Sequence, residues 1–177
     1  MISDAHSSVP VRVGLLGCGN VGGALAALLA EEGEGLFART GLRLELTRVA
    51  VRNTAKSRGP NVPDHLLTND AAAVVVADDV DVVVELIGGI EPARSLILDA
   101  LKAGKPVVTG NKELVADLGE ELFQAAGAAG VDLLFEAAVA GGIPIMRPLR
   151  ESLAGERLTR IMGIVNGTTN YLSLIHI

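Results

Sequence analysis

The chain has 177 residues, 49% of them hydrophobic and only 2% aromatic, with a formal net charge of −6 at pH 7. That length fits one ordinary domain, or one domain and the beginning of a second, and the acidic balance without a basic run argues against a nucleic-acid partner. Apolar runs such as residues 71–77 are far too short to cross a bilayer, and the polar N-terminus lacks the apolar core of a signal peptide. A single cysteine, Cys18, excludes an internal disulfide framework. We therefore expect a cytoplasmic protein with neither a nucleic-acid nor a membrane partner.

Strand patterns alternate with amphipathic helix patterns along most of the chain. Gly33 and Gly35 are expected to end the first helix, and Pro92 suits the first turn of the third. Because strands alternating with helices form βαβ units, we predict an α/β fold with a Rossmann-type, doubly wound parallel sheet. The predicted order is strand 11–16, helix 20–32, strand 42–51, loop 52–68, helix 69–76, strand 81–87, helix 91–103, strand 105–109, helix 112–129 and strand 131–135.

The pattern changes after Gly141. Residues 143–153 are predicted to be helical, and residues 158–165 are predicted to form a strand of another sheet. This change indicates the start of a second, α+β domain.

The first motif is Gly-Cys-Gly-Asn-Val-Gly at residues 17–22, which matches G-x-G-x-x-G. It follows the first predicted strand and opens the first helix, the setting of the dinucleotide-binding fingerprint. There Gly17 permits a tight turn, Gly19 lets the backbone approach a pyrophosphate, and Gly22 allows close packing of helix on strand. The helix N-terminus offers free N–H groups to the phosphates. We predict a dinucleotide site, the alternative being a glycine-rich turn without a ligand; Cys18 is interpreted only as a small turn residue.

The end of the second predicted strand bears on the choice between NADP and NAD. NAD sites usually place an acid there to bind the ribose 2′-hydroxyl, whereas this chain has Arg52 between Val51 and Asn53. A guanidinium matches the geometry of a 2′-phosphate. NADP is therefore favoured over NAD, the alternative being an ordinary solvated arginine.

Three later stretches also lie at the carboxyl ends of predicted strands, where open α/β sheets bind ligands: residues 85–89, 109–112 and 136–143. Lys112 begins a helix, where a cation opposes the macrodipole, so we interpret it as facing a polar or anionic ligand rather than solvent. For Glu85, a functional role and a bond to nearby backbone stay equally open. Glu136 precedes a turn of small residues whose carbonyls suit a hard cation, although the spacing alone indicates an ordinary turn.

Taken together, five blocks resemble those of homoserine dehydrogenases in the same order: GLLGCGNVG, VVVELIGG, PVVTGNKELVA, FEAAVAGGIPI and GIVNGTTNY. The resemblance covers about residues 11–171. It implies NAD(P)-dependent interconversion of L-homoserine and L-aspartate 4-semialdehyde in threonine and methionine biosynthesis. It also implies an NAD(P)-binding domain at 11–140 after a flexible leader at 1–10, and the start of a catalytic and dimerisation domain at 141–171. The full-length enzyme is accordingly expected to be a homo-oligomer.

The resemblance also assigns individual residues. The cofactor falls to Gly17, Gly19, Asn20, Val21, Gly22, Arg52, Gly88 and Lys112. Lys112 is expected to face nicotinamide and substrate. The family's monovalent cation, usually sodium, falls on Glu136 and on the backbone carbonyls of Val139, Gly141 and Ile143.

In the family, the aspartate and lysine thought to assist hydride transfer lie beyond the NGTTNY block, so we expect no catalytic residue and little activity in this fragment. Residues 172–177 match what one reading frame of a sequencing adapter encodes, and we hypothesise that they are a non-native tail. His176 is then not a catalytic base. Two alternatives stay open: another two-domain amino-acid dehydrogenase, and a non-catalytic nucleotide-sensing Rossmann module.

Overall fold

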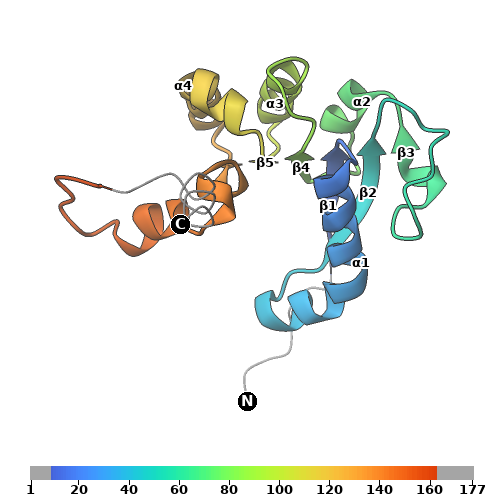
Figure 1. The fold of residues 1–177 in the computed structure, drawn as a ribbon, viewed down its shortest axis with the longest axis horizontal. Helices are drawn as coiled ribbons and strands as arrows, with labels where there is room; N and C mark the ends of the chain where they lie inside the picture. The colour runs from blue at the N-terminus through green and yellow to red at the C-terminus, as the bar shows by residue number, and fades with distance from the viewer. Residues whose placement is uncertain (1–8, 163–177) are drawn as a thin grey trace, which may run out of the picture.

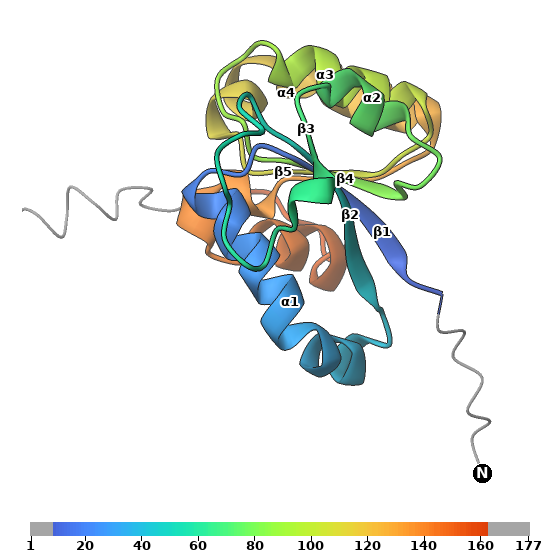
Figure 2. The ribbon, with the colours of Figure 1, turned by 90° about the vertical axis from the view of Figure 1, so that its right-hand side faces the viewer.

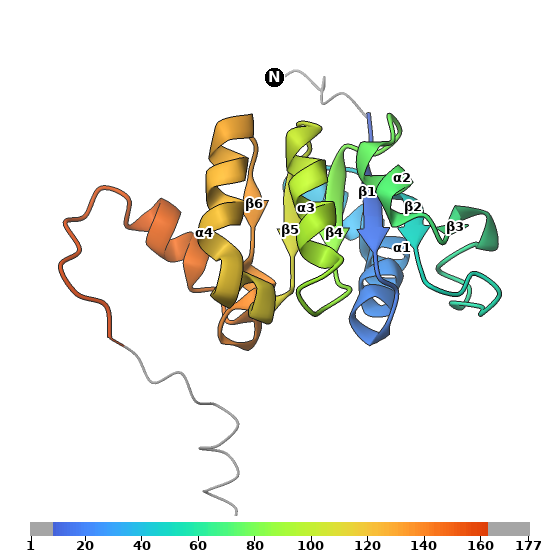
Figure 3. The same cartoon turned by 90° about the horizontal axis from the view of Figure 1, so that it is seen from above.

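A parallel sheet of six strands in the order β3-β2-β1-β4-β5-β6 forms the centre of the computed structural model, which describes residues 9–162 (Figures 1 and 3). All neighbouring strands pair in parallel. The predicted Rossmann-type, doubly wound sheet is therefore confirmed. The strands are β1 (Val11–Leu16), β2 (Leu44–Ala50), β3 (Leu67–Thr68), β4 (Val82–Glu85), β5 (Val107–Thr109) and β6 (Leu133–Leu134). The α-helices are α1 (Asn20–Thr40), α2 (Ala71–Val76), α3 (Ala93–Lys102) and α4 (Lys112–Ala129).

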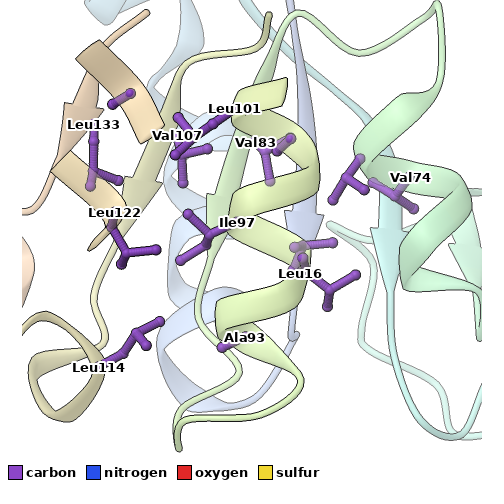
Figure 4. Packing of buried hydrophobic residues seen from close by; sticks show 14 of the residues in the cluster. Leu16, Val74, Val83, Ala93, Ile97, Leu101, Val107, Leu114, Leu122 and Leu133 are labelled. Carbon is purple, nitrogen blue, oxygen red and sulfur yellow. The ribbon is translucent and has the colours of Figure 1, made fainter. Parts of the chain in front are cut away.

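Helices α2, α3 and α4 cover one face of the sheet, and α1 lies on the other (Figure 2). Helix α3 shows why its side of the sheet packs well: its buried residues Ala93, Leu96, Ile97, Ala100 and Leu101 recur at helical spacing and form one apolar stripe. Ile97 and Leu101 are fully buried against strand residues that include Val83 and Val107 (Figure 4). Full burial of one such side chain stabilises the fold by about 1.5–3 kcal/mol.

Helix α1 is longer than predicted. It continues through Gly33 and Gly35 and ends at Gly41, whose φ of 72° is left-handed and whose N–H donates to the carbonyl of Phe37 at 2.8 Å. The prediction that Gly33 and Gly35 end the helix was wrong, because an interior glycine costs only about 1 kcal/mol and tertiary packing outweighs that cost. The glycine that ends a helix is the one that adopts the left-handed conformation.

The segment predicted as a loop at 52–68 contains the edge strand of the sheet, β3. A 3-10 turn, η1 (Asp64–Leu66), leads into β3, where Leu67 pairs with Val49 and Thr68 with Ala50. A strand of two residues is too short to show an alternating pattern, so the sequence offered no periodic signal for it.

Beyond β6 the backbone forms short turns: η2 (Glu136–Ala138), η3 (Ala140–Gly142) and the π-helical turn η4 (Pro148–Ser152). The helix predicted at 143–153 is thus only partly formed. Residues 158–162 form no strand, because no paired strand satisfies their backbone groups within the described range. The rest of that predicted strand, the leader up to residue 8 and the tail at 172–177 lie outside the described residues.

Between residues 9 and 162, no helix has the length and apolar character needed to span a membrane.

Candidate functional site

The loops that follow β1, β4 and β5 meet at the carboxyl edge of the sheet. The chain passes from β1 into α1 on one face and from β4 and β5 into α3 and α4 on the other, so the strand order reverses between β1 and β4. Such a reversal opens the crevice in which doubly wound folds bind ligands. The three loops are closely packed, since a Cβ added at Gly17 would lie 2.8 Å from the carbonyl oxygen of Leu86, and one added at Gly110 would lie 2.9 Å from the Leu86 side chain.

The glycine turn uses each of its glycines for a different physical reason. Gly17 has a φ of 92°, which favours glycine, and its N–H donates to the carbonyl of Ala50 at 3.0 Å. A Cβ at Gly22 would lie 2.2 Å from the carbonyl oxygen of Gly17, so no side chain fits where α1 meets the turn. At Gly19 the corresponding position has no heavy atom within 4 Å. The first and last glycines therefore shape the turn, and the middle one leaves the backbone open.

The N-terminus of α1 is exposed next to this turn. Gly19 is the N-cap and supplies no side-chain hydrogen bond, and the first turn of the helix contains no acid. Asn20 is exposed, and Val21 is 65% exposed. The free N–H groups and the positive end of the helix dipole therefore face solvent, an arrangement that attracts anions.

Arg52 is exposed at the start of the loop that follows β2. Within residues 9–162 it makes no ion pair. Its guanidinium is thus available to a ligand at the carboxyl edge.

Arg58 is a residue that the sequence pattern did not indicate. Its Nη1 donates to the carbonyl of Cys18 at 2.8 Å and its Nη2 to the carbonyl of Asn53 at 3.3 Å, while its Nε is buried without a hydrogen-bond partner. Arg58 thereby joins the loop after β2 to the glycine turn. Cys18 itself is 6% exposed, and burial raises the pKa of its thiol, against the opposing effect of Arg58. A neutral, buried thiol agrees with the interpretation of Cys18 as a small turn residue.

The carboxyl ends of β4 and β5 are joined by buried polar groups. The carboxylate of Glu85 accepts hydrogen bonds from the N–H groups of Ile87 and Gly88 and from the hydroxyl of Thr109. Glu85 therefore makes the backbone bonds that were one of the two open interpretations.

Helix α4 begins at Lys112, as predicted. Asn111 is its N-cap, and its side-chain oxygen accepts from the N–H of Leu114 at 3.1 Å. Lys112 is exposed, and no carboxylate of the described chain lies within ion-pair distance of it. Its positive charge stands at the positive end of a helix, so an anionic or polar ligand there would relieve the repulsion.

Glu136 begins the turn η2 that follows β6, and the next residue, Ala137, lies near Gly110 in the loop after β5. Its two carboxylate oxygens accept from the N–H groups of Met146 and Arg147, each at 3.0 Å. Val139 separates the turns η2 and η3, Gly141 has a φ of 66°, and Ile143 is 59% exposed. Within residues 9–162, no group of three or more His, Cys, Asp or Glu side chains is placed to hold a metal ion, so a cation at this turn would need carbonyl oxygens beside Glu136.

The parallel sheet, the glycine turn and the open helix end at the reversal of strand order define the class of protein: a Rossmann-type dinucleotide-binding domain. The family model described as the NAD binding domain of homoserine dehydrogenase matches residues 17–136, and a second homoserine dehydrogenase model matches residues 144–174. The chain belongs to the homoserine dehydrogenase family. Membership excludes the alternative of another amino-acid dehydrogenase family.

Individual relatives agree with this assignment. The homoserine dehydrogenase of Corynebacterium glutamicum is 54% identical over 162 residues, and that of Mycobacterium tuberculosis is 52% identical over 163 residues; each alignment covers 92% of this chain. The chain spans only 36% of the length of either relative.

Solved structures show the same fold. The homoserine dehydrogenase from Thiobacillus denitrificans has a TM-score of 0.76 and 48% identity, over 84% of this chain and 34% of its own. A hyperthermophilic archaeal homoserine dehydrogenase, solved in complex with NADPH, has a TM-score of 0.68 and 26% identity, over 83% of this chain and 50% of its own.

Proposed function

We propose that this chain supplies the cofactor-binding part of an enzyme that interconverts L-homoserine and L-aspartate 4-semialdehyde with NADP(H). Family membership supports the reaction, and the open backbone at Gly19 beside the exposed N-terminus of α1 is the observation that carries cofactor binding. We propose the domain boundaries 11–140 for the nucleotide-binding domain and 141–171 for the start of the catalytic and dimerisation domain. The complete enzyme is a homo-oligomer in this proposal.

The cofactor is proposed to lie across the reversal of strand order. Gly17, Gly19, Asn20, Val21 and Gly22 hold the pyrophosphate through backbone N–H groups and the helix dipole. Arg52, on the β2 side, pairs with the 2′-phosphate, a role supported by its exposure and lack of an ion-pair partner among residues 9–162.

On the β4 and β5 side of the crevice, Gly88 and Lys112 are proposed to face the nicotinamide half, with Lys112 also close to substrate. The NADPH complex of the archaeal relative supports a phosphorylated nicotinamide nucleotide as the ligand. When bound, that nucleotide supplies or accepts the hydride.

A monovalent cation such as sodium is proposed at Glu136, Val139, Gly141 and Ile143. The residues fit such an ion, because the donor set is all oxygen and each carboxylate oxygen of Glu136 keeps a lone pair beyond the single N–H that it accepts. The ion would neutralise the Glu136 carboxylate and brace the turn that leads out of the nucleotide-binding domain.

The alternative of a nucleotide-sensing module without chemistry is disfavoured by one observation. The second homoserine dehydrogenase model matches residues 144–174, which a nucleotide-binding module alone does not require.

Replacing Gly19 tests the proposed site. Gly19→Val places a branched side chain where the pyrophosphate approaches, and we expect NADPH affinity to fall by about a hundredfold or more as charge-assisted hydrogen bonds are lost. The fold should survive, because the Gly19 φ of −85° suits any residue and its Cβ position is open. Fluorescence titration of NADPH measures the affinity. Gly127→Val is the matched control, since it adds the same side chain to an open position on α4 far along the chain. Equal affinity in parent and Gly19→Val would remove the pyrophosphate role.

A further inference from the structure

Glu85 is a fully buried carboxylate that the proposed cofactor contacts do not use. It ends β4 at the crevice, and among the described residues no Lys, Arg or His forms an ion pair with it. Burying an unpaired carboxylate is costly unless hydrogen bonds replace the lost water. Glu85 receives three such bonds: from Ile87 N–H at 2.7 Å, from Gly88 N–H at 3.2 Å and from the Thr109 hydroxyl at 2.6 Å.

The first two bonds hold the glycine pair that follows β4. The N–H groups of Ile87 and Gly88 converge on one oxygen of Glu85, as backbone N–H groups do around a bound anion. Gly88 and Gly89 have φ values of 81° and 73°, so two consecutive residues adopt the left-handed conformation. The carboxylate is therefore an internal anion that keeps this unusual turn in one conformation.

The third bond extends to the start of α4. The Thr109 hydroxyl donates a hydrogen bond to Glu85, and the Thr109 oxygen in turn accepts a hydrogen bond from Asn111 N–H at 3.1 Å. The side-chain nitrogen of Asn111 donates to the carbonyl of Gly89 at 2.6 Å. Glu85, Thr109, Asn111 and the Gly88–Gly89 turn thus form a closed ring of hydrogen bonds, and Lys112 follows Asn111 directly.

We propose that Glu85 is a positioning residue for the nicotinamide end of the cofactor site. Through Thr109 and Asn111 it sets the Gly88–Gly89 turn and Lys112 in a fixed relation to each other. This inference rests on the proposed function, because it assumes that Gly88 and Lys112 face the nicotinamide half. The ring includes none of the glycine turn at 17–22 and does not include Arg52, so the adenosine half should be independent of it.

Two ligands separate a positioning role from general support of the fold. NADPH reaches both halves of the site, whereas adenosine 2′,5′-bisphosphate lacks the nicotinamide half. Thr109→Val removes the hydroxyl with little change of shape and leaves Glu85 and the Asn111 N–H each short of one partner. By calorimetric titration of the 177-residue chain we expect NADPH affinity to fall about tenfold, as befits loss of a buried hydrogen bond, and bisphosphate affinity to change less than about twofold.

Thr109→Ser is the matched control, because it keeps the hydroxyl; it should bind both ligands like the parent. Asn111→Ser provides a second variant, since serine still caps α4 but cannot reach Gly89 with an amide. It should reproduce the selective loss of NADPH affinity even if Thr109→Val fails to fold. Equal weakening of both ligands, or no change in either, would overturn the positioning role. A parent chain that binds neither ligand would overturn the proposed function itself, and the inference with it.

Discussion

Arg52 is the single residue on which the proposed preference for NADP depends. Arg52→Asp places a negative charge against a 2′-phosphate, so NADPH affinity should fall about tenfold to a hundredfold while NADH affinity changes little. Parallel titrations with the two nucleotides measure the ratio. Arg39→Asp makes the same charge change at an exposed position in the last turn of α1 and should leave the ratio unaltered. An NADPH-to-NADH ratio equal to that of the parent would make Arg52 an ordinary surface residue.

The residues that the sequence could assign are those whose roles are local. Gly17 and Gly22 are needed by a turn only six residues long, so their spacing alone predicts their conformation and packing. Arg58 and Glu85 are different: Arg58 bonds to a carbonyl 40 positions away, and Glu85 to a hydroxyl 24 positions away. No local pattern contains such partners, because the sheet brings them together.

Helix α1 offers a test at the scale of one element, since it contains glycines with opposite conformational needs. Gly33 lies inside the helix with open space around its Cβ position, so Gly33→Ala should stabilise the chain by about 1 kcal/mol. Gly41 ends the helix with a φ of 72°, so Gly41→Ala should destabilise it by about 1 kcal/mol. Thermal unfolding should therefore shift by about 2–4 °C in opposite directions. A gain in stability for Gly41→Ala would contradict the helix end at Gly41, and a loss for Gly33→Ala would contradict a helix that continues through Gly33.

The contrast between local patterns and partners distant in the sequence also explains which elements could be predicted. Helices α3 and α4 carry apolar stripes at helical spacing, and α4 also has its asparagine cap, so its bounds at 112–129 are confirmed. β3 has two residues and is defined by its pairing with β2, which no short pattern reveals. At η4 the helical period is present but develops into only a short π-helical turn, because little of the chain packs against it.

At the scale of the whole molecule, the two faces of the sheet are covered unequally. In β4, β5 and β6 the residues that face α3 and α4 are fully or almost fully buried, namely Val83, Val107 and Leu133. Their neighbours on the other face are less covered: Val84 and Val108 are half-buried, and Leu134 is 40% exposed. The alternation of strands and helices made the fold class predictable, but it does not reveal how completely each face is covered.

We expect the 177-residue chain to bind cofactor without turning over substrate. Oxidation of homoserine requires a group that takes the hydroxyl proton and contacts that hold the substrate against the nicotinamide. We propose that Lys112 supplies one polar contact and that the others lie in the part of the relatives' length that this chain does not match. Homoserine-dependent reduction of NADP should therefore be undetectable for the 177-residue chain at concentrations that saturate it with nucleotide.

The 177-residue chain should be compared with a chimera that continues after residue 171 with the corresponding portion of the Corynebacterium glutamicum enzyme. The matched region of that enzyme is 54% identical to this chain. The chimera should reduce NADP at a rate that depends on homoserine, because we propose that the added portion contains the proton-transfer group and the remaining substrate contacts. Lys112→Met in the chimera should then lower turnover, since it keeps the length of the side chain but removes its charge. Equal turnover by the chimera and the shorter chain would return catalysis to the described residues, with Lys112 as the first to test.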